Sequence, residues 1–124
     1  MAGWSERIPA AAVAPSCASM IGHTYRTRPV REPRRPVGAV EIDPDDPAIP
    51  APIRALHPVA IDVGPTDVDL VLGRYVPAGA AEDEIDRYGL VCAPNGKLSA
   101  AFTSLDGPFL KPLGPGLWSY DRVL

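Results

Sequence analysis

The chain has 124 residues, enough for one domain that buries roughly two-thirds of its unfolded surface. It contains 16 prolines, and because each proline removes a backbone donor, long helices and central strands are excluded where prolines recur. Charge is uneven: residues 1–40 carry six arginines against two glutamates, whereas residues 41–87 carry eleven acids against three arginines. A basic segment is therefore followed by an acidic one.

The N-terminal half shows few signs of regular structure. Residues 1–28 predict only a short helix, Cys17–Ile21, capped by Ser16 and ended by Gly22. Residues 29–65 hold nine prolines, and only Val37–Ile42 and Val59–Val63 are free of proline for long enough to form strands. We therefore expect residues 1–56 to form an extended, proline-rich arm, basic and then acidic.

The pattern changes after residue 66. Apolar and polar residues alternate over Asp67–Val76, which predicts a strand with one buried face and a bulge at Gly73. Ala80–Tyr88 predicts a short helix, because acids occupy its first turns and Gly89 follows its end. Leu117–Val123 predicts a final strand with Trp118 and Tyr120 on one face.

The most specific local signal is Pro94-Asn95-Gly96, since proline suits the first central position of a turn and glycine the left-handed one. It predicts a β-hairpin that pairs Leu90–Ala93 with Lys97–Ser104. The predicted fold class is mostly β. Residues 57–124 form a small antiparallel β-barrel or sandwich with one short helix, and the extended arm precedes it.

Candidate chemistry is sparse. Cys17 and Cys92 are too few and too far apart in sequence for a disulfide framework or a zinc site, and we expect two reduced thiols. A nucleophile–base pair of Cys92 with His57 or His23, oriented by Asp62, has no supporting motif. The sequence predicts no catalytic residue and a chain that is not an enzyme.

Metal and cofactor patterns are also weak. Asp43, Asp45 and Asp46, with Glu41, could offer oxygen ligands to calcium, but the run lacks the glycine and the final glutamate of an EF-hand. A solvated acidic turn is the preferred interpretation. The glycines match neither dinucleotide-binding nor phosphate-loop patterns, so we expect no metal and no cofactor.

Membrane and secretion signals are not predicted. No apolar run approaches 18 residues. Glu6 and Pro9 interrupt the start of the chain, which does not resemble a secretory signal. We expect a virion or cytoplasmic assembly as the location, and no membrane partner.

The basic segment is the best candidate for a protein interface. Its arginines could contact phosphates, remain solvated, or pair with the carboxylates of a protein neighbour, including residues 41–87 of a second copy. The acidic middle of the chain opposes nucleic acid, so protein is the favoured partner. Trp4 is a candidate anchor for a neighbour's pocket. The predicted interface residues are Trp4, Arg26, Arg28, Arg31, Arg34 and Arg35.

The arm leads to a functional hypothesis. Ordering residues 29–65 costs more conformational entropy than the burial of their own aliphatic side chains can offset, so a neighbouring surface should supply the difference. We therefore expect a non-enzymatic structural protein of a large symmetric complex. The concrete case is a phage-like virion component: a head decoration, a head–tail connector or a tail accessory. Its partners would be copies of itself and a major shell or tube protein.

Two alternatives remain open. The chain could be a soluble β-barrel module that binds a small ligand or a regulatory partner. A small thiol enzyme built on Cys92 is the third possibility.

Overall fold

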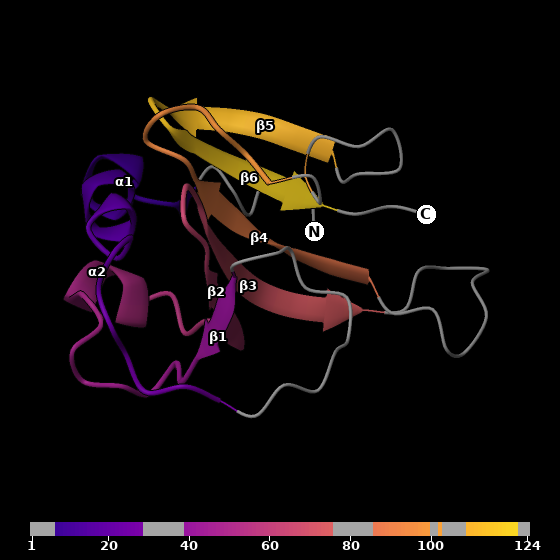
Figure 1. Cartoon of the computed structure of the whole chain (residues 1–124). Helices are drawn as coiled ribbons and strands as arrows, with labels where there is room; N and C mark the ends of the chain where they lie inside the picture. The colour runs from indigo at the N-terminus through magenta and orange to yellow at the C-terminus, as the bar shows by residue number, and fades with distance from the viewer. Residues whose placement is uncertain (1–6, 29–38, 76–85, 100–101, 103–108, 122–124) are drawn as a thin grey trace.

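The computed structural model describes residues 7–28, 39–75, 86–99, 102 and 109–121, and the findings below concern these residues. They form one antiparallel sheet of six strands in the order β1-β2-β3-β4-β6-β5, with two helices beside it (Figure 1). The helices are α1 (Ala10–Ala18) and α2 (Ala51–Arg54). The strands are β1 (Val40–Ile42), β2 (Ala60–Val63), β3 (Val68–Tyr75), β4 (Asp86–Cys92), β5 (Phe109–Gly114) and β6 (Leu117–Asp121).

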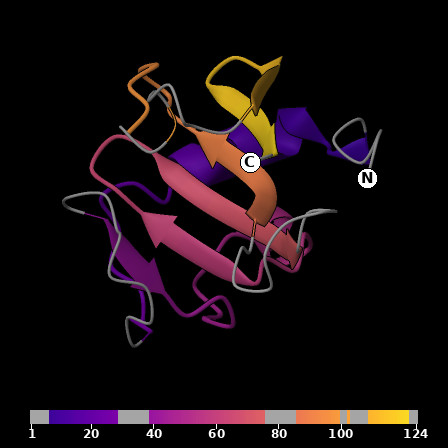
Figure 2. The ribbon, with the colours of Figure 1, turned by 90° about the vertical axis from the view of Figure 1, so that its right-hand side faces the viewer.

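The sheet is open. β1 and β5 lie at its two ends and do not pair with each other. The expectation of a mostly β, antiparallel fold is confirmed, whereas the barrel is not. In the described residues a layer of helices covers one face of the sheet (Figure 1), and the strands twist strongly across it (Figure 2).

The larger core lies on the face covered by α1 and α2, called the helix face below. Alternation along the strands sends Ile61, Leu70 and Leu90 to this face, where they are inaccessible to solvent. Val13 and Ile53 meet them from the two helices. The opposite face, called the second face, carries a smaller cluster of Val91, Phe102 and Tyr120.

The N-terminal segment contributes half of the larger core. Six of the twelve buried residues in this cluster precede residue 57: Val13, Cys17, Met20, Ile42, Ile49 and Ile53. Residues 7–28 and 39–56 are therefore folded onto the sheet and do not extend away from it, which corrects our expectation for these parts of the arm. The boundary between residues 56 and 57 stays a prediction.

The predicted helix Cys17–Ile21 is wrong in its bounds. Helix α1 begins at Ala10 and ends at Ala18, so Ser16 lies inside it and Pro9, not Ser16, is its N-cap. Alanine has the highest helix propensity, and five of the nine residues of α1 are alanine. Pro15 removes one internal hydrogen bond, but burial of Val13 and Cys17 holds the helix against the sheet. Gly22 has a positive φ of 85°, but it lies four residues beyond Ala18 in the turn after α1, so it does not end the helix as predicted.

Several predicted strands are confirmed. β3 coincides with the alternating segment that begins at Asp67, and its register shifts between Val71 and Gly73, where the bulge was predicted. A Cβ atom at Gly73 would overlap the ring of Tyr88 on β4, so glycine is required at this irregularity. β6 also forms as predicted, with Trp118 and Tyr120 packed in the same cluster.

The predicted hairpin around residues 94–96 is wrong. The turn forms, because Gly96 has φ 73° and its N–H donates to the Ala93 carbonyl at 2.8 Å. However, β4 pairs with β3 on one side and with β6 on the other, and residues 97–99 are not in a strand. Turn chemistry is local, whereas strand pairing is decided by which distant apolar strand completes the core.

The predicted helix Ala80–Tyr88 is contradicted at its end. Asp86, Arg87 and Tyr88 pair with β3 as part of strand β4. Residues 80–85 lie outside the described residues. Pairing with the long neighbouring strand outweighs the weak helical pattern at this end of the segment.

Candidate functional site

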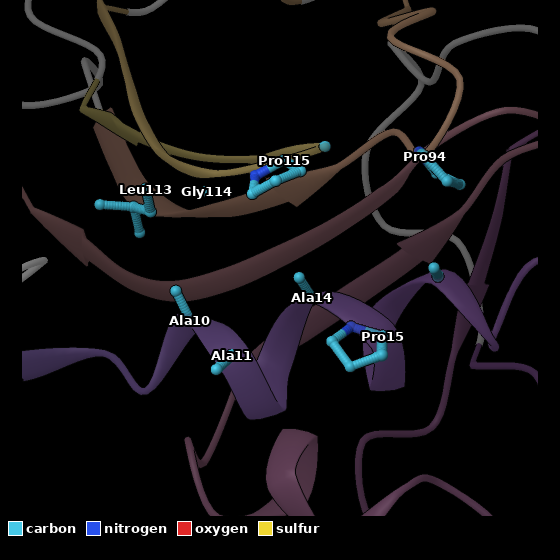
Figure 3. A pocket seen from close by; sticks show the side chains of 10 residues that line it. Ala10, Ala11, Ala14, Pro15, Pro94, Leu113, Gly114 and Pro115 are labelled. Carbon is cyan, nitrogen blue, oxygen red and sulfur yellow. The ribbon is translucent and has the colours of Figure 1, made fainter.

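A cleft of about 600 Å³ lies between α1 and the β5–β6 hairpin (Figure 3). Figure 3 shows Ala10 and Ala14 on the side of α1 that faces Leu113 and Pro115. The lining residues come from α1, from the turn after β4, and from the β5–β6 hairpin. They are Ala10, Ala11, Ala14, Pro15, Ala18, Pro94, Leu113, Gly114, Pro115 and Gly116.

The cleft exists because its walls carry small side chains. Ala10, Ala14 and Ala18 recur every four residues, which places their methyl groups along one line of the helix. Opposite them, the β5–β6 turn passes through Gly116 with φ 70°. Gly114 is so close to the helix that its Cβ would lie 3.9 Å from the Cβ of Ala10.

The chemistry of the cleft is that of recognition. Its lining holds no titratable and no nucleophilic side chain. The cleft therefore offers apolar walls, which suit an apolar group.

The two cysteines form a disulfide, which corrects the expectation of two reduced thiols. Cys17 of α1 is bonded to Cys92 of β4 across a sequence separation of 75 residues, with their Cα atoms 6.2 Å apart. Both residues are almost completely buried. Sequence separation does not exclude such a bond, because docking of α1 on the sheet brings the two positions together.

The disulfide also removes the nucleophile from the thiol-enzyme alternative. A thiolate attacks, whereas a disulfide sulfur does not. While this bond is intact, Cys92 cannot act with His57 or His23.

A polar cluster lies on the second face of the sheet. Tyr120 of β6 donates its hydroxyl to Oδ1 of Asp69 on β3 at 2.5 Å, and Arg87 of β4 approaches Oδ2 of Asp69 at 3.6 Å. Asp69 is 6% exposed and Tyr120 is 1% exposed. The Tyr120–Asp69 bond thus spans β4, which lies between β6 and β3, and gives both buried polar groups a partner.

Carboxylates form a row across three strands beside this cluster. Asp62 of β2 is directly opposite Asp69, and Glu41 of β1 is directly opposite Asp62. The pKa of Asp69 is raised to about 6, chiefly by burial; Arg87 and the Tyr120 hydrogen bond lower it, and Asp62 and Asp67 raise it. Burial, with the charge of Asp69, also holds the pKa of Tyr120 well above its usual value.

Two predicted interface residues lie along β1. Thr27 bridges to Ile42, and the Arg28 N–H donates to the Glu41 carbonyl at 3.0 Å. The Arg28 guanidinium donates to the Val59 carbonyl at 2.9 Å, and the Arg26 N–H donates to Asp46 Oδ2 at 2.8 Å. Residues 26–28 therefore cover the β1 edge of the sheet.

The other predicted interface residues, Trp4, Arg31, Arg34 and Arg35, lie outside the described residues. The interface as a whole stays a prediction.

The acidic turn after β1 is held together by its own backbone. Asp46 accepts N–H bonds from Arg26 and Ala48, which lower the pKa of its carboxyl group. Asp43 accepts the N–H of Asp45 at 2.9 Å. Within the described ranges, no three His, Cys, Asp or Glu side chains gather in a way that could hold a metal ion.

No helix among the described residues is long and apolar enough to cross a membrane. In comparisons with known proteins, no family model, no curated protein and no solved structure matches the chain.

Sequence reasoning missed both the cleft and the polar cluster. Alanines at positions 10, 14 and 18 were a usable signal for a flat helix face. Asp67 and Asp69 in an otherwise apolar strand were a signal for carboxylates on the second face. Nothing local to Tyr120 indicated that it would meet Asp69, because 51 residues separate them.

Proposed function

We propose that this chain is a non-enzymatic assembly component of a large symmetric complex, in which the cleft between α1 and the β5–β6 hairpin receives an apolar side chain from an extended segment of a neighbouring subunit. The cleft carries this proposal, because its lining combines small apolar residues with no group that could perform acid–base or nucleophilic chemistry. Pocket-filling by an extended neighbouring segment is a common way for subunits to bind one another.

The proposed complex is a phage-like particle, with this chain as a head decoration, a head–tail connector or a tail accessory. Small β-domains combined with proline-rich segments suit such positions, an argument by analogy of fold and composition. The proposed partners are copies of this chain and a major shell or tube protein. Trp4 and the arginines at positions 26, 28, 31, 34 and 35 remain the proposed contacts outside the cleft.

The same cleft favours a second candidate function, a module that binds a small ligand. Its volume of about 600 Å³ falls in the range of roughly 300–1,000 Å³ typical of small-molecule sites. This alternative predicts a stable monomer that binds an apolar probe. The assembly proposal predicts self-association instead.

Substitution at the cleft tests the proposal. Ala11 is exposed and lines the cleft, whereas Ala12 is equally exposed on α1 but does not line it. We expect Ala11→Trp to block the cleft and to weaken self-association, measured by sedimentation velocity, by about tenfold or more, a loss of about 1.4 kcal/mol. Ala12→Trp is the matched control and should associate like the wild type.

Three outcomes are informative. Loss of association in Ala11→Trp alone supports the cleft as the assembly surface. Equal association of both variants and the wild type rejects the cleft while leaving assembly intact. A monomeric wild type that binds anilinonaphthalene sulfonate, with binding lost in Ala11→Trp, supports the ligand-binding module and rejects assembly.

A further inference from the structure

Asp69 is unusual among the described acids because it is buried at the centre of the sheet with other acids nearby. β3 is flanked by β2 and β4, so the groups that face Asp69 come from several elements. They are Asp62 on β2, Asp67 beside β3, Arg87 on β4 and Tyr120 on β6, with Glu41 on β1 next to Asp62.

The pairing register places Asp62 directly opposite Asp69. Residues directly opposite on antiparallel strands share one face, with their Cβ atoms about 4.5–5.5 Å apart, and like charges in such a pair oppose strand pairing. Arg87 forms an ion pair with Asp69. The distance from its Nη2 to Oδ2 of Asp69 is 3.6 Å, which is long for a strong ion pair. The negative charges of Asp62 and Asp67 oppose ionisation of Asp69 and raise its pKa, whereas Arg87 favours ionisation.

We propose that the Asp62–Asp69 pair is a pH-sensitive clasp: one proton held by Asp69 removes the repulsion between the two opposite carboxylates, and loss of that proton loosens β2 and its neighbour β1 from β3. The proton comes from solvent and returns to solvent, and no covalent bond changes. Tyr120 continues to donate to Oδ1 in both states, so Asp69 stays anchored on the β6 side.

We expect local opening at β1 and β2 rather than at the centre of the sheet. β1 has three residues and β2 has four, whereas β3 and β4 pair over seven positions. Edges with few ladder hydrogen bonds open locally at lower cost than the centre of a sheet. Ile42 and Ile61 remain in the core on the helix face, so the clasp changes local protection without detaching the strands.

The pH window follows from the raised pKa of Asp69, about 6 in the folded chain against an ordinary value of 3.8. A raised carboxyl pKa means that the folded state binds the proton more tightly than the unfolded state, so this contribution to stability is greatest in acid and is lost as pH rises toward and through about 6. The clasp is therefore tighter near pH 5 than above pH 7.

The first test is the titration of Asp69 in the wild-type chain, followed by the NMR shift of its carboxyl carbon. We expect a midpoint near 6 and a lower midpoint in Asp62→Asn, because this substitution removes one of the like charges. A wild-type midpoint near 4 would overturn the proposal, and this result does not depend on the folding of any variant.

The second test is amide hydrogen exchange at β2, compared near pH 5 and above pH 7 after correction for intrinsic rates. We expect protection in β2 to fall by up to about tenfold as pH rises from 5 to above 7, because a carboxyl group with a pKa of about 6 is mostly protonated at pH 5 and mostly ionised above pH 7. Protection in β6 should change less.

Asp69→Asn removes the charge and keeps an oxygen that accepts from Tyr120, so β2 should keep its protection at both pH values. Asp45→Asn, at an exposed acid, is the matched control and should behave like the wild type. Equal pH dependence of β2 in the wild type and in Asp69→Asn would also overturn the clasp.

Discussion

Single residues on the second face connect the strands through polar contacts as well as through apolar packing. The Tyr120 hydroxyl is paired with Asp69 across a gap in sequence of 51 residues, and both groups are buried. A buried acceptor that loses its donor costs roughly 1–3 kcal/mol. This single contact is therefore a sensitive probe of the fold.

We expect Tyr120→Phe to lower the free energy of unfolding by about 1–3 kcal/mol, because it removes the hydrogen-bond donor to a buried oxygen of Asp69. The Tyr120 hydrogen bond favours the charged form of Asp69, so its removal raises the pKa of Asp69 further. The loss should therefore be larger above pH 6, where Asp69 is ionised in the wild type, than near pH 4. Chemical denaturation at the two pH values measures the difference.

Tyr25→Phe is the matched control for this prediction, because Tyr25 is half-buried and packs against the core of the helix face. Its effect should be smaller and should not change sign or size with the titration of Asp69. A loss in Tyr120→Phe that is the same at both pH values would contradict the assigned role of the hydroxyl.

Residue roles were predictable only where they depend on local geometry. The positive φ of Gly96 and the bulge at Gly73 follow from turn chemistry and strand pattern. The burial of Cys17 and the partners of Asp69 depend on tertiary contacts between distant segments, and no local pattern encodes them.

At the scale of elements, α1 is fixed to the sheet by one covalent bond and by apolar packing. The Cys17–Cys92 bond joins the helix to β4, the strand between β3 and β6. In the chain-entropy model, closing a loop of 75 residues stabilises the folded state by roughly 4 kcal/mol, by restricting the unfolded chain. This is a large fraction of the stability of a small domain.

We therefore expect Cys17→Ser with Cys92→Ser to lower the free energy of unfolding by about 3–5 kcal/mol, since the buried hydroxyl groups add to the lost cross-link. Denaturant unfolding measures the change. The control is the wild type under a thiol reductant during unfolding, which should lose a comparable amount, whereas the double variant should not respond to the reductant. Full reactivity of two thiols in the denatured, unreduced wild type would contradict the disulfide.

Elements were predicted best where one pattern dominated. β2 follows from a stretch free of proline, β3 from the alternation of apolar and polar residues, and β6 from Trp118 and Tyr120 on one face. The predicted second strand of the hairpin, at residues 97–99, does not form. β6 pairs with β4 instead and places Leu117 opposite Cys92 and Trp118 opposite Val91. A turn signal specifies a reversal of the chain and leaves the choice of strand partner to the core.

At the scale of the whole molecule, the prolines shape the fold in a different way from our expectation. Several of them sit at the ends of elements, such as Pro9 before α1 and Pro50 before α2, where a missing N–H costs little. Proline content indicated an extended arm, but it fits equally well with short elements separated by turns. This ambiguity explains why the β class was predictable and the packing of residues 7–28 and 39–56 was not.

The account of function depends on self-association through the cleft, and sedimentation velocity of the full oxidised chain over a wide range of concentration tests it most directly. The account predicts species at multiples of the 13.1 kDa chain, present in the wild type and in Ala12→Trp and reduced in Ala11→Trp. A single species at the mass of the monomer for all three proteins, at every concentration, would contradict it.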